Sequence, residues 1–300
     1  MADVLKLGMV GLDTSHCAAF TALLNEEANA YHVPGARVVK AFPGGSALTT
    51  VSTGRVETIT AEMRERFDME IADSLEALAG LDGYLLESVD GRQHLAQFRV
   101  LAQFGKPVFI DKPLACSAED ATAIFALARQ HGAPVMTASS LRYAAGVDGM
   151  APADAEVFSA EAFGPMSILE DYPTYFWYGI HSAEMLFALM GAGCRAVTAH
   201  HAEHYDVLVG EWADGRLATV RGTRGAWPSF GAVALTSDGL KSAIALGTPP
   251  YYFRLLQRVV PFLQTGVSPI PDAESVEIAA FLEAAGQSLA SGGMRVELPL

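Results

Sequence analysis

The segment VFIDKPLA at residues 108–115 decides how this sequence is interpreted, together with the segment GLDTSH at residues 11–16. The first is a short apolar run that ends in an acidic residue, a lysine and a proline, as a buried parallel strand does where it leaves a sheet. The second closes another apolar run, residues 5–12, and places the cap-type residues Thr14 and Ser15 before a helical pattern. Both segments therefore predict the carboxyl edge of a parallel sheet, where open α/β folds bind ligands.

Strands and helices alternate on both sides of these two segments up to about residue 140. Further strand-like runs are Arg37–Phe42, a short run near Ile71, Gly83–Val89, Pro107–Ile110 and Pro134–Thr137. Helical patterns are Glu57–Phe67, Ser74–Ala79, Leu95–Phe104 and a helix that opens with the capping box Ser117–Asp120 and runs to His131. This alternation predicts a doubly wound parallel sheet of α/β class in a first domain, residues 1–140.

The pattern changes after about Leu141. Helices are expected at Ile180–Met190 and Ala273–Ser291. Strand-like runs are Ala196–His201, Val207–Trp212, Leu217–Arg221, Ala232–Thr236, Ser242–Ala245 and Arg295–Leu298. Turns of the Asp-Gly type separate several of these runs, as in antiparallel hairpins. We therefore expect a second α/β domain, residues 141–300, with a large open, mostly antiparallel sheet.

The composition and net charge of the chain exclude some classes of binding partner. The 300 residues are 51% hydrophobic, enough for a large core, and carry a formal net charge of −14. That charge argues against binding to nucleic acid or to an anionic membrane surface. The three widely spaced cysteines and the lack of a long apolar run predict a reduced, cytoplasmic setting.

Three segments resemble the glucose-fructose oxidoreductase / inositol dehydrogenase / MocA (Gfo/Idh/MocA) family. The segment at 108–115 is similar to the family's EKPLA run, with Asp111 in place of the usual glutamate. The segment YGIHSAE at 178–184 is similar to its GxHxxD helix, and Glu277–Leu298 resembles its last helix and strand. The resemblance implies an N-terminal Rossmann-like domain that binds NAD or NADP, and a C-terminal α/β domain with a large open sheet.

The resemblance assigns catalytic roles to Lys112 and His181. Lys112 matches the lysine that contacts the substrate and the nicotinamide ribose, and His181 matches the acid/base that acts on the substrate hydroxyl. A neutral imidazole suits proton transfer near neutral pH. The alternatives are a surface lysine after a strand and a histidine that packs or caps a helix.

The sequence departs from the family pattern before His181. The family commonly has an aspartate four residues earlier, where this chain has Trp177, and an indole cannot exchange a proton. Either Tyr178 or another group replaces the carboxylate, or the site does different chemistry. The aromatic residues from Tyr172 to Tyr178, with Trp177 and Tyr178 as substrate contacts, form either a stacking wall for a sugar ring or a hydrophobic contact between domains.

The turn at Gly11 departs from the pattern as well. Gly11, Asp13, Thr14 and Ser15, with Lys112, are the expected cofactor contacts, yet two of the three fingerprint glycines are missing. An Asp13 carboxylate that caps the helix is expected to repel a pyrophosphate, whereas the Thr14 and Ser15 hydroxyls can donate to one.

The second strand ends without the acidic residue that holds an adenosine ribose, and Ser46 with Lys40 is a faint indication of a 2′-phosphate site. The choice between NAD and NADP therefore stays open.

His94 and Arg142 complete the expected site. His94 matches a position near the nicotinamide in the family, or is an exposed histidine at a helix start. Arg142 matches an arginine that often begins the second domain; it either binds an anionic or polyhydroxy substrate or makes an ion pair between domains.

A metal site is not expected. His181 and Glu184 lie one helical turn apart, and His200, His201 and His204 follow downstream. Adjacent residues of a strand point to opposite faces, so His200 and His201 do not converge readily on one ion.

The first hypothesis is an enzyme, an NAD(P)-dependent oxidoreductase acting on a sugar, cyclitol or related small polyhydroxy substrate. The alternative is a non-redox lyase or isomerase of the same fold that uses Lys112 and His181 after losing standard dinucleotide binding. A binding or regulatory protein with a vestigial site is the third. Because large sheet faces seek cover, a homodimer or homotetramer is expected.

Overall fold

The computed structural model describes residues 4–151, 154–225 and 229–300. It divides into two compact units. Unit 1 consists of Met1–Ala115, Glu119–Ala138 and Tyr252–Pro271, and unit 2 of Cys116–Ala118, Ser139–Tyr251 and Asp272–Leu300. The two continuous domains expected from the sequence are therefore interrupted, because a late segment around residues 252–271 packs with the first unit.

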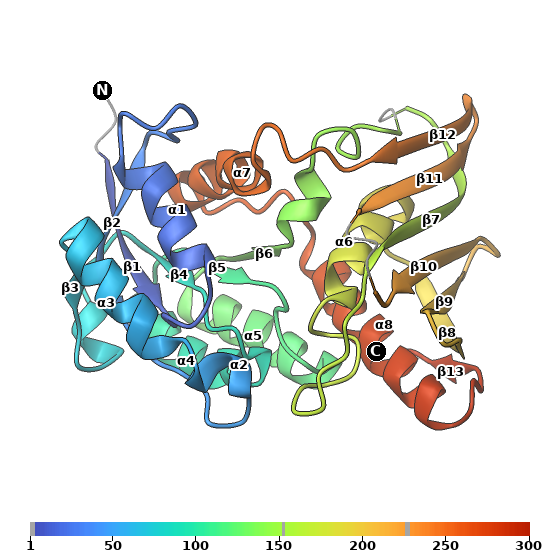
Figure 1. Cartoon of the computed structure of the whole chain (residues 1–300), viewed down its shortest axis with the longest axis horizontal. Helices are drawn as coiled ribbons and strands as arrows, with labels where there is room; N and C mark the ends of the chain where they lie inside the picture. Colours follow the sequence, from blue (N-terminus) through green and yellow to red (C-terminus); the bar gives the residue numbers. More distant parts are fainter. Residues whose placement is uncertain (1–3, 152–153, 226–228) are drawn as a thin grey trace. The chain divides into compact units, whose positions relative to one another are not determined.

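A six-stranded sheet forms the centre of unit 1 (Figure 1). In spatial order its strands are β3 (Glu70–Ile71), β2 (Ala36–Phe42), β1 (Leu5–Val10), β4 (Gly83–Leu86), β5 (Val108–Asp111) and β6 (Val135–Ala138). All neighbouring strands are parallel, as the alternation of elements predicts. The strand order reverses between β1 and β4, and ligands of open α/β sheets bind at such a point.

Helices surround this sheet. They are α1 (His16–Asn25), α2 (Thr50–Thr53), α3 (Val56–Phe67), α4 (His94–Leu101), α5 (Ala118–His131) and α7 (Tyr251–Thr265), with the short 3-10 segments η1 (Glu76–Leu78), η2 (Gly91–Gln93) and η3 (Ala102–Phe104). The helix expected at Ser74–Ala79 is only the single turn η1, because Gly80 follows with a φ of 88° and one turn is too short to nucleate a helix.

Helix α7 was not expected from the sequence. It contains Pro261, which removes one internal hydrogen bond, so propensity disfavours it. Its amphipathic face compensates by burying six apolar side chains: Leu255, Leu256, Val259, Val260, Phe262 and Leu263. Tyr252 at its start packs against Phe20 of α1 with ring centroids 5.4 Å apart, so tertiary burial fixes this helix.

Unit 2 is built on a seven-stranded sheet. In spatial order its strands are β12 (Gly239–Ile244), β11 (Gly231–Thr236), β7 (Val157–Pro165), β10 (Leu217–Thr223), β9 (Tyr205–Trp212), β8 (Cys194–His201) and β13 (Val296–Glu297). Only the β7–β10 pair is parallel, which agrees with the expected mostly antiparallel sheet. Strand β7 was not expected. Its inward residues Ala160, Ala162 and Gly164 are small, so the alternation of apolar and polar residues that indicates a strand is weak there.

Two helices cover one face of this second sheet. Helix α6 (Gly179–Met190) lies against β7 and β10, and α8 (Asp272–Ala290) lies against β8 (Figure 1). The short 3-10 segment η4 (Ser140–Tyr143) packs on α6.

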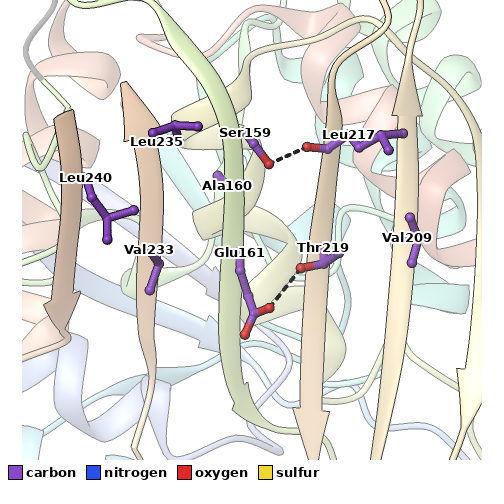
Figure 2. A pocket seen from close by; sticks show the side chains of 9 residues that line it. All are labelled: Ser159, Ala160, Glu161, Val209, Leu217, Thr219, Val233, Leu235 and Leu240. Atoms are coloured by element: carbon purple, nitrogen blue, oxygen red, sulfur yellow. Dashed lines mark hydrogen bonds between the residues drawn. The ribbon is translucent and has the colours of Figure 1, made fainter. Parts of the chain in front are cut away.

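The opposite face carries exposed apolar side chains, among them Leu217 at 53% and Leu240 at 72% exposure. Figure 2 shows a shallow hollow on this face, lined by Ser159, Ala160, Glu161, Val209, Leu217, Thr219, Val233, Leu235 and Leu240.

Within the described ranges, no helix combines the length and the apolar character needed to span a membrane.

Candidate active site

The turn after β1 requires glycine at its first position. Gly11 has a φ of 87°, and a Cβ built on it would lie 2.4 Å from the Cα and the backbone N of Ser88. No side chain fits at that distance, so the backbone of the turn packs directly on the segment after β4. The first fingerprint glycine therefore keeps its structural function.

Asp13 does not cap helix α1, contrary to the expectation from the sequence. Its carboxylate is completely buried and accepts hydrogen bonds from the Val89 N–H at 2.9 Å and the Ser52 hydroxyl at 2.7 Å. Burial raises the pKa of Asp13, and these two hydrogen bonds oppose the rise. The helix cap is Ser15, which makes no side-chain cap hydrogen bond.

The N–H groups of Thr14 and Ser15 are therefore left for an external acceptor. Neither has a hydrogen-bond partner in the part of the chain that the structure describes. Backbone N–H groups at a helix N-terminus bind phosphate without any positive side chain. Thr14 and Ser15, with Gly11, thus fit the pyrophosphate of a dinucleotide, although the second and third fingerprint glycines are replaced.

The turn after β2 lies beside this one, because Leu12 N–H donates to the Pro43 carbonyl at 2.7 Å. Ser46 is buried there and its hydroxyl donates to Asp90 at 2.6 Å. Lys40 pairs with Glu70 at 2.7 Å. Both residues suggested for a 2′-phosphate are thus bound to carboxylates of the protein, and the geometry gives no basis for NADP over NAD.

Lys112 directly follows β5 and is 7% exposed. Its charge lowers the pKa values of Glu87 and Asp111, two buried carboxylates nearby. Burial, together with the neighbouring Asp111, nevertheless leaves the pKa of Glu87 well above its ordinary value. Burial also acts to raise the pKa of Asp111, but the charges of His16 and Lys112 outweigh it and lower that pKa.

His16 completes this carboxylate group. Its Nδ1 lies 2.8 Å from Asp111 and 3.9 Å from Glu87. Sequence reasoning did not select His16 or Glu87, although two signals were present. His16 stands at the third fingerprint position, and Glu87 follows an apolar strand at the edge where ligands bind.

His94 is neither an exposed helix-start histidine nor placed to reach a substrate from the surface. It is completely buried, with one ring nitrogen 2.7 Å from the Ser88 carbonyl and the other 3.2 Å from the Leu114 carbonyl. It connects the segments that follow β4 and β5.

In unit 2, His181 lies in the first turn of α6 and is 8% exposed. Its Nδ1 lies 2.6 Å from the Ser139 hydroxyl, which also accepts a hydrogen bond from the Leu141 N–H at 3.2 Å. The ring stands edge-on to Tyr178 and Phe230, at centroid distances of 5.3 and 5.6 Å. A hydroxyl both accepts and donates, so Ser139 can hold His181 in either tautomer.

Arg142 is held between two carboxylates of unit 2. Its guanidinium donates to Glu184 at 3.0 Å and to Glu274, and its side chain is 10% exposed. Burial raises the pKa of Glu184 to about 7, against the charge of Arg142. Arg142 thus makes ion pairs within unit 2, and these account for it without a substrate.

The aromatic segment before α6 divides into core and surface. Tyr172, Tyr175 and Phe176 are buried, and the Tyr175 hydroxyl donates to Asp206 at 3.1 Å. Trp177 and Tyr178 are half-buried, with ring centroids 5.7 Å apart. Of this segment, Tyr178 lies against His181, and Trp177 packs on Tyr178.

The histidines weighed for a metal do not gather. Among the described residues, the one group of three or more potential ligands is His16, Glu87 and Asp111, in unit 1. The His201 Nδ1 instead lies within hydrogen-bond distance, 2.8 Å, of an Asp206 carboxylate oxygen.

Comparison with known proteins agrees with this fold. Residues 6–139 match the Gfo/Idh/MocA profile, described as an oxidoreductase family with an NAD-binding Rossmann fold. No protein with curated functional information matches.

Solved structures match over nearly the whole chain. One is GenD2 from gentamicin A biosynthesis in complex with NAD, 18% identical over 100% of this chain and 98% of its own, with a TM-score of 0.76. Another is scyllo-inositol dehydrogenase from Lactobacillus casei with NAD(H) and scyllo-inositol, 12% identical over 99% and 100%, with a TM-score of 0.74.

A third is an oxidoreductase from Agrobacterium radiobacter in complex with NAD+, L-tartaric acid and magnesium, 15% identical over 99% of each chain, with a TM-score of 0.74. At these identities the likeness shows the fold. Residues 6–139 match an oxidoreductase family with an NAD-binding Rossmann fold, so NAD or NADP is the cofactor that this part of the chain fits.

Proposed function

We propose that the protein oxidises a secondary alcohol of a small polyhydroxy compound, a sugar or cyclitol, or reduces the corresponding ketone. The observation that carries the proposal is His181, a nearly buried histidine oriented by Ser139 at 2.6 Å and flanked by half-buried aromatic rings. Bound NAD(P)+ supplies the hydride acceptor. The relatives crystallised with scyllo-inositol and with tartaric acid support a substrate rich in hydroxyl groups.

His181 is assigned the proton transfer. When its Nδ1–H donates to the Ser139 hydroxyl, the Nε2 lone pair accepts the proton of the substrate hydroxyl. The resulting imidazolium keeps the same hydrogen bond, so the ring does not have to turn during the reaction. Ser139 thereby positions the base.

Lys112 is assigned to the substrate oxygen and the nicotinamide ribose. It lies at the carboxyl end of β5, where the fold binds ligands, and its ammonium can polarise the reacting oxygen. Trp177 and Tyr178 are assigned to the face of the substrate ring. Tyr178 lies against His181 and Trp177 against Tyr178, and half-exposed rings of this kind suit the C–H face of a sugar or cyclitol.

The non-redox alternative loses one of its supports. It included Asp13 as a block on the pyrophosphate site, but the Asp13 carboxylate accepts hydrogen bonds from Val89 and Ser52. The Thr14 and Ser15 N–H groups are left for a phosphate. No second candidate function is favoured by an observation.

The test is steady-state kinetics on a panel of cyclitols and sugars with NAD+ and NADP+. We expect turnover of at least one polyol, a loss of kcat of at least a hundredfold in Lys112→Met and His181→Asn, and unchanged dinucleotide binding in His181→Asn. Full activity in both variants would contradict the assignment.

We also propose that the protein is a homo-oligomer that pairs through the open face of the unit 2 sheet, in the cytoplasm. The hollow between Leu217, Leu235 and Leu240 leaves apolar surface in water, and a second copy of the same face covers it (Figure 2). The absence of disulfides among Cys17, Cys116 and Cys194 supports a reducing compartment. Light scattering is expected to give a dimer or tetramer for the natural sequence and a smaller species for Leu240→Glu.

A further inference from the structure

Three ionisable side chains converge in unit 1 from segments far apart in the sequence. His16 is the first residue of α1, Glu87 directly follows β4, and Asp111 is the last residue of β5. One nitrogen or oxygen atom from each lies within 4.8 Å of the others. All three residues are buried, with Glu87 at 0% and Asp111 at 3% exposure.

Three carboxylate oxygens of this cluster lack a hydrogen-bond partner among the described residues. Neither oxygen of Glu87 has a hydrogen-bond partner in the part of the chain that the structure describes, and the same holds for Oδ1 of Asp111. The His16 Nδ1 lies 2.8 Å from the other oxygen of Asp111, Oδ2. Buried polar atoms are almost always bonded to protein, water or an ion, so atoms left over in one place indicate a missing partner.

We propose that His16, Glu87 and Asp111 bind a divalent transition-metal ion, with Zn²⁺ or Mn²⁺ as the best chemical match. An imidazole nitrogen with two carboxylates is a common ligand set for such ions. Donor atoms around a tetrahedral ion lie about 3 to 3.5 Å apart, given metal–ligand distances near 2.1 Å. The distances of 2.8 and 3.9 Å from the His16 Nδ1 bracket that value, so small side-chain shifts suffice.

The two buried carboxylates supply the negative charge that attracts a divalent ion. Three protein ligands leave a coordination position for a water molecule or a ligand oxygen, as in catalytic rather than structural sites. The proposal goes beyond the oxidoreductase activity and does not depend on it.

The experiment uses the full-length protein, treated with EDTA and dialysed, and titrated with Co²⁺ while visible absorption is recorded. Co²⁺ is the probe because its d–d bands report coordination by protein ligands. Zn²⁺ binding is then measured by calorimetry. We expect one equivalent of each ion to bind, and at least tenfold weaker binding in His16→Asn and Glu87→Gln.

Glu87→Gln keeps the size of the side chain, so its fold is expected to survive, and circular dichroism checks this for each variant. His200→Asn removes an exposed histidine of β8 and serves as the matched control, with unchanged binding expected. Absence of Co²⁺ bands in the natural protein would overturn the proposal. Equal binding in Glu87→Gln would also overturn it and place the ion at surface groups. NADH binding is measured separately, so a failure of the metal proposal can be told apart from a failure of the assigned cofactor site.

Discussion

The buried Glu184, which pairs with Arg142 in unit 2, is expected to make the free energy of unfolding depend on pH. The single substitution Glu184→Gln isolates this contribution. Burial raises the pKa of Glu184 from an ordinary value of 4.5 to about 7, although Arg142 opposes the rise. Between these values the unfolded chain releases its proton while the folded chain keeps it. Stability from this group is therefore complete below pH 4.5 and is lost as the pH rises through 7.

The size of the effect follows from the shift. At 1.36 kcal/mol per pKa unit, the loss amounts to about 3 kcal/mol between pH 4.5 and pH 8. Glutamine resembles the protonated carboxyl, so Glu184→Gln is expected to lack this loss. If the glutamine contacts Arg142 less well, the variant is less stable by the same amount at every pH. Residue 184 then adds nothing to the slope of its free energy of unfolding against pH.

The assay is urea unfolding of both proteins from pH 4.5 to pH 8. The difference in free energy of unfolding, natural protein minus variant, is expected to fall by about 3 kcal/mol over this range. Glu203→Gln is the control, because Glu203 has a side chain 88% exposed, and its curve is expected to run parallel to that of the natural protein. A difference between the natural protein and Glu184→Gln that is constant with pH would refute the reasoning.

Two further predictions concern the turn and the proposed base. Gly11→Ala combines a φ of 87° with a Cβ 2.4 Å from Ser88 backbone atoms, so we expect a loss of about 3 kcal/mol in thermal or urea unfolding. Gly80→Ala is the control: Gly80 has a φ of 88° and no atom within 4 Å of an added Cβ, so only the backbone strain of a positive φ is expected, about 1 kcal/mol. Equal losses of stability in the two variants would contradict a steric clash at residue 11. Ser139→Ala removes the partner of His181 and is expected to lower kcat about tenfold and shift its pH profile, with the Kd of NADH unchanged; an unchanged kcat and pH profile would show that Ser139 does not position the base.

The sequence predicts those parts of the fold that depend on local pattern. The β1–turn–α1 segment and the alternation through β6 are confirmed because each strand is a continuous apolar run. Helix α7 and strand β7 were missed because partners distant in sequence specify them. Helix α7 tolerates Pro261 since its apolar face is buried, and β7 presents small residues inward since α6 packs there.

The candidate site also combines residues that local sequence motifs identify with residues whose contacts depend on distant parts of the chain. Lys112 and His181 lie in recognisable motifs, whereas the behaviour of Asp13 depends on Ser52 and Val89, 39 and 76 positions away. From its residue type alone, Asp13 is expected to cap the helix. In the structure its carboxylate instead accepts hydrogen bonds from the buried Val89 N–H and the buried Ser52 hydroxyl. The cluster of His16, Glu87 and Asp111 is equally non-local, because it joins the ends of three segments that only the sheet order brings together.

The central claim is that the turn after Gly11 binds the phosphates of a dinucleotide through main-chain N–H groups. Its most direct test is a fluorescence titration of the natural protein, Ser15→Pro and Ser15→Ala with NADH and NADPH. Ser15 has a φ of −63°, which proline also adopts, so Ser15→Pro removes the N–H while keeping this backbone angle. We predict micromolar binding of NADH or NADPH to the natural protein, about tenfold weaker binding to Ser15→Pro and little change for Ser15→Ala. No binding at millimolar dinucleotide, or equal affinity in Ser15→Pro, would contradict the account.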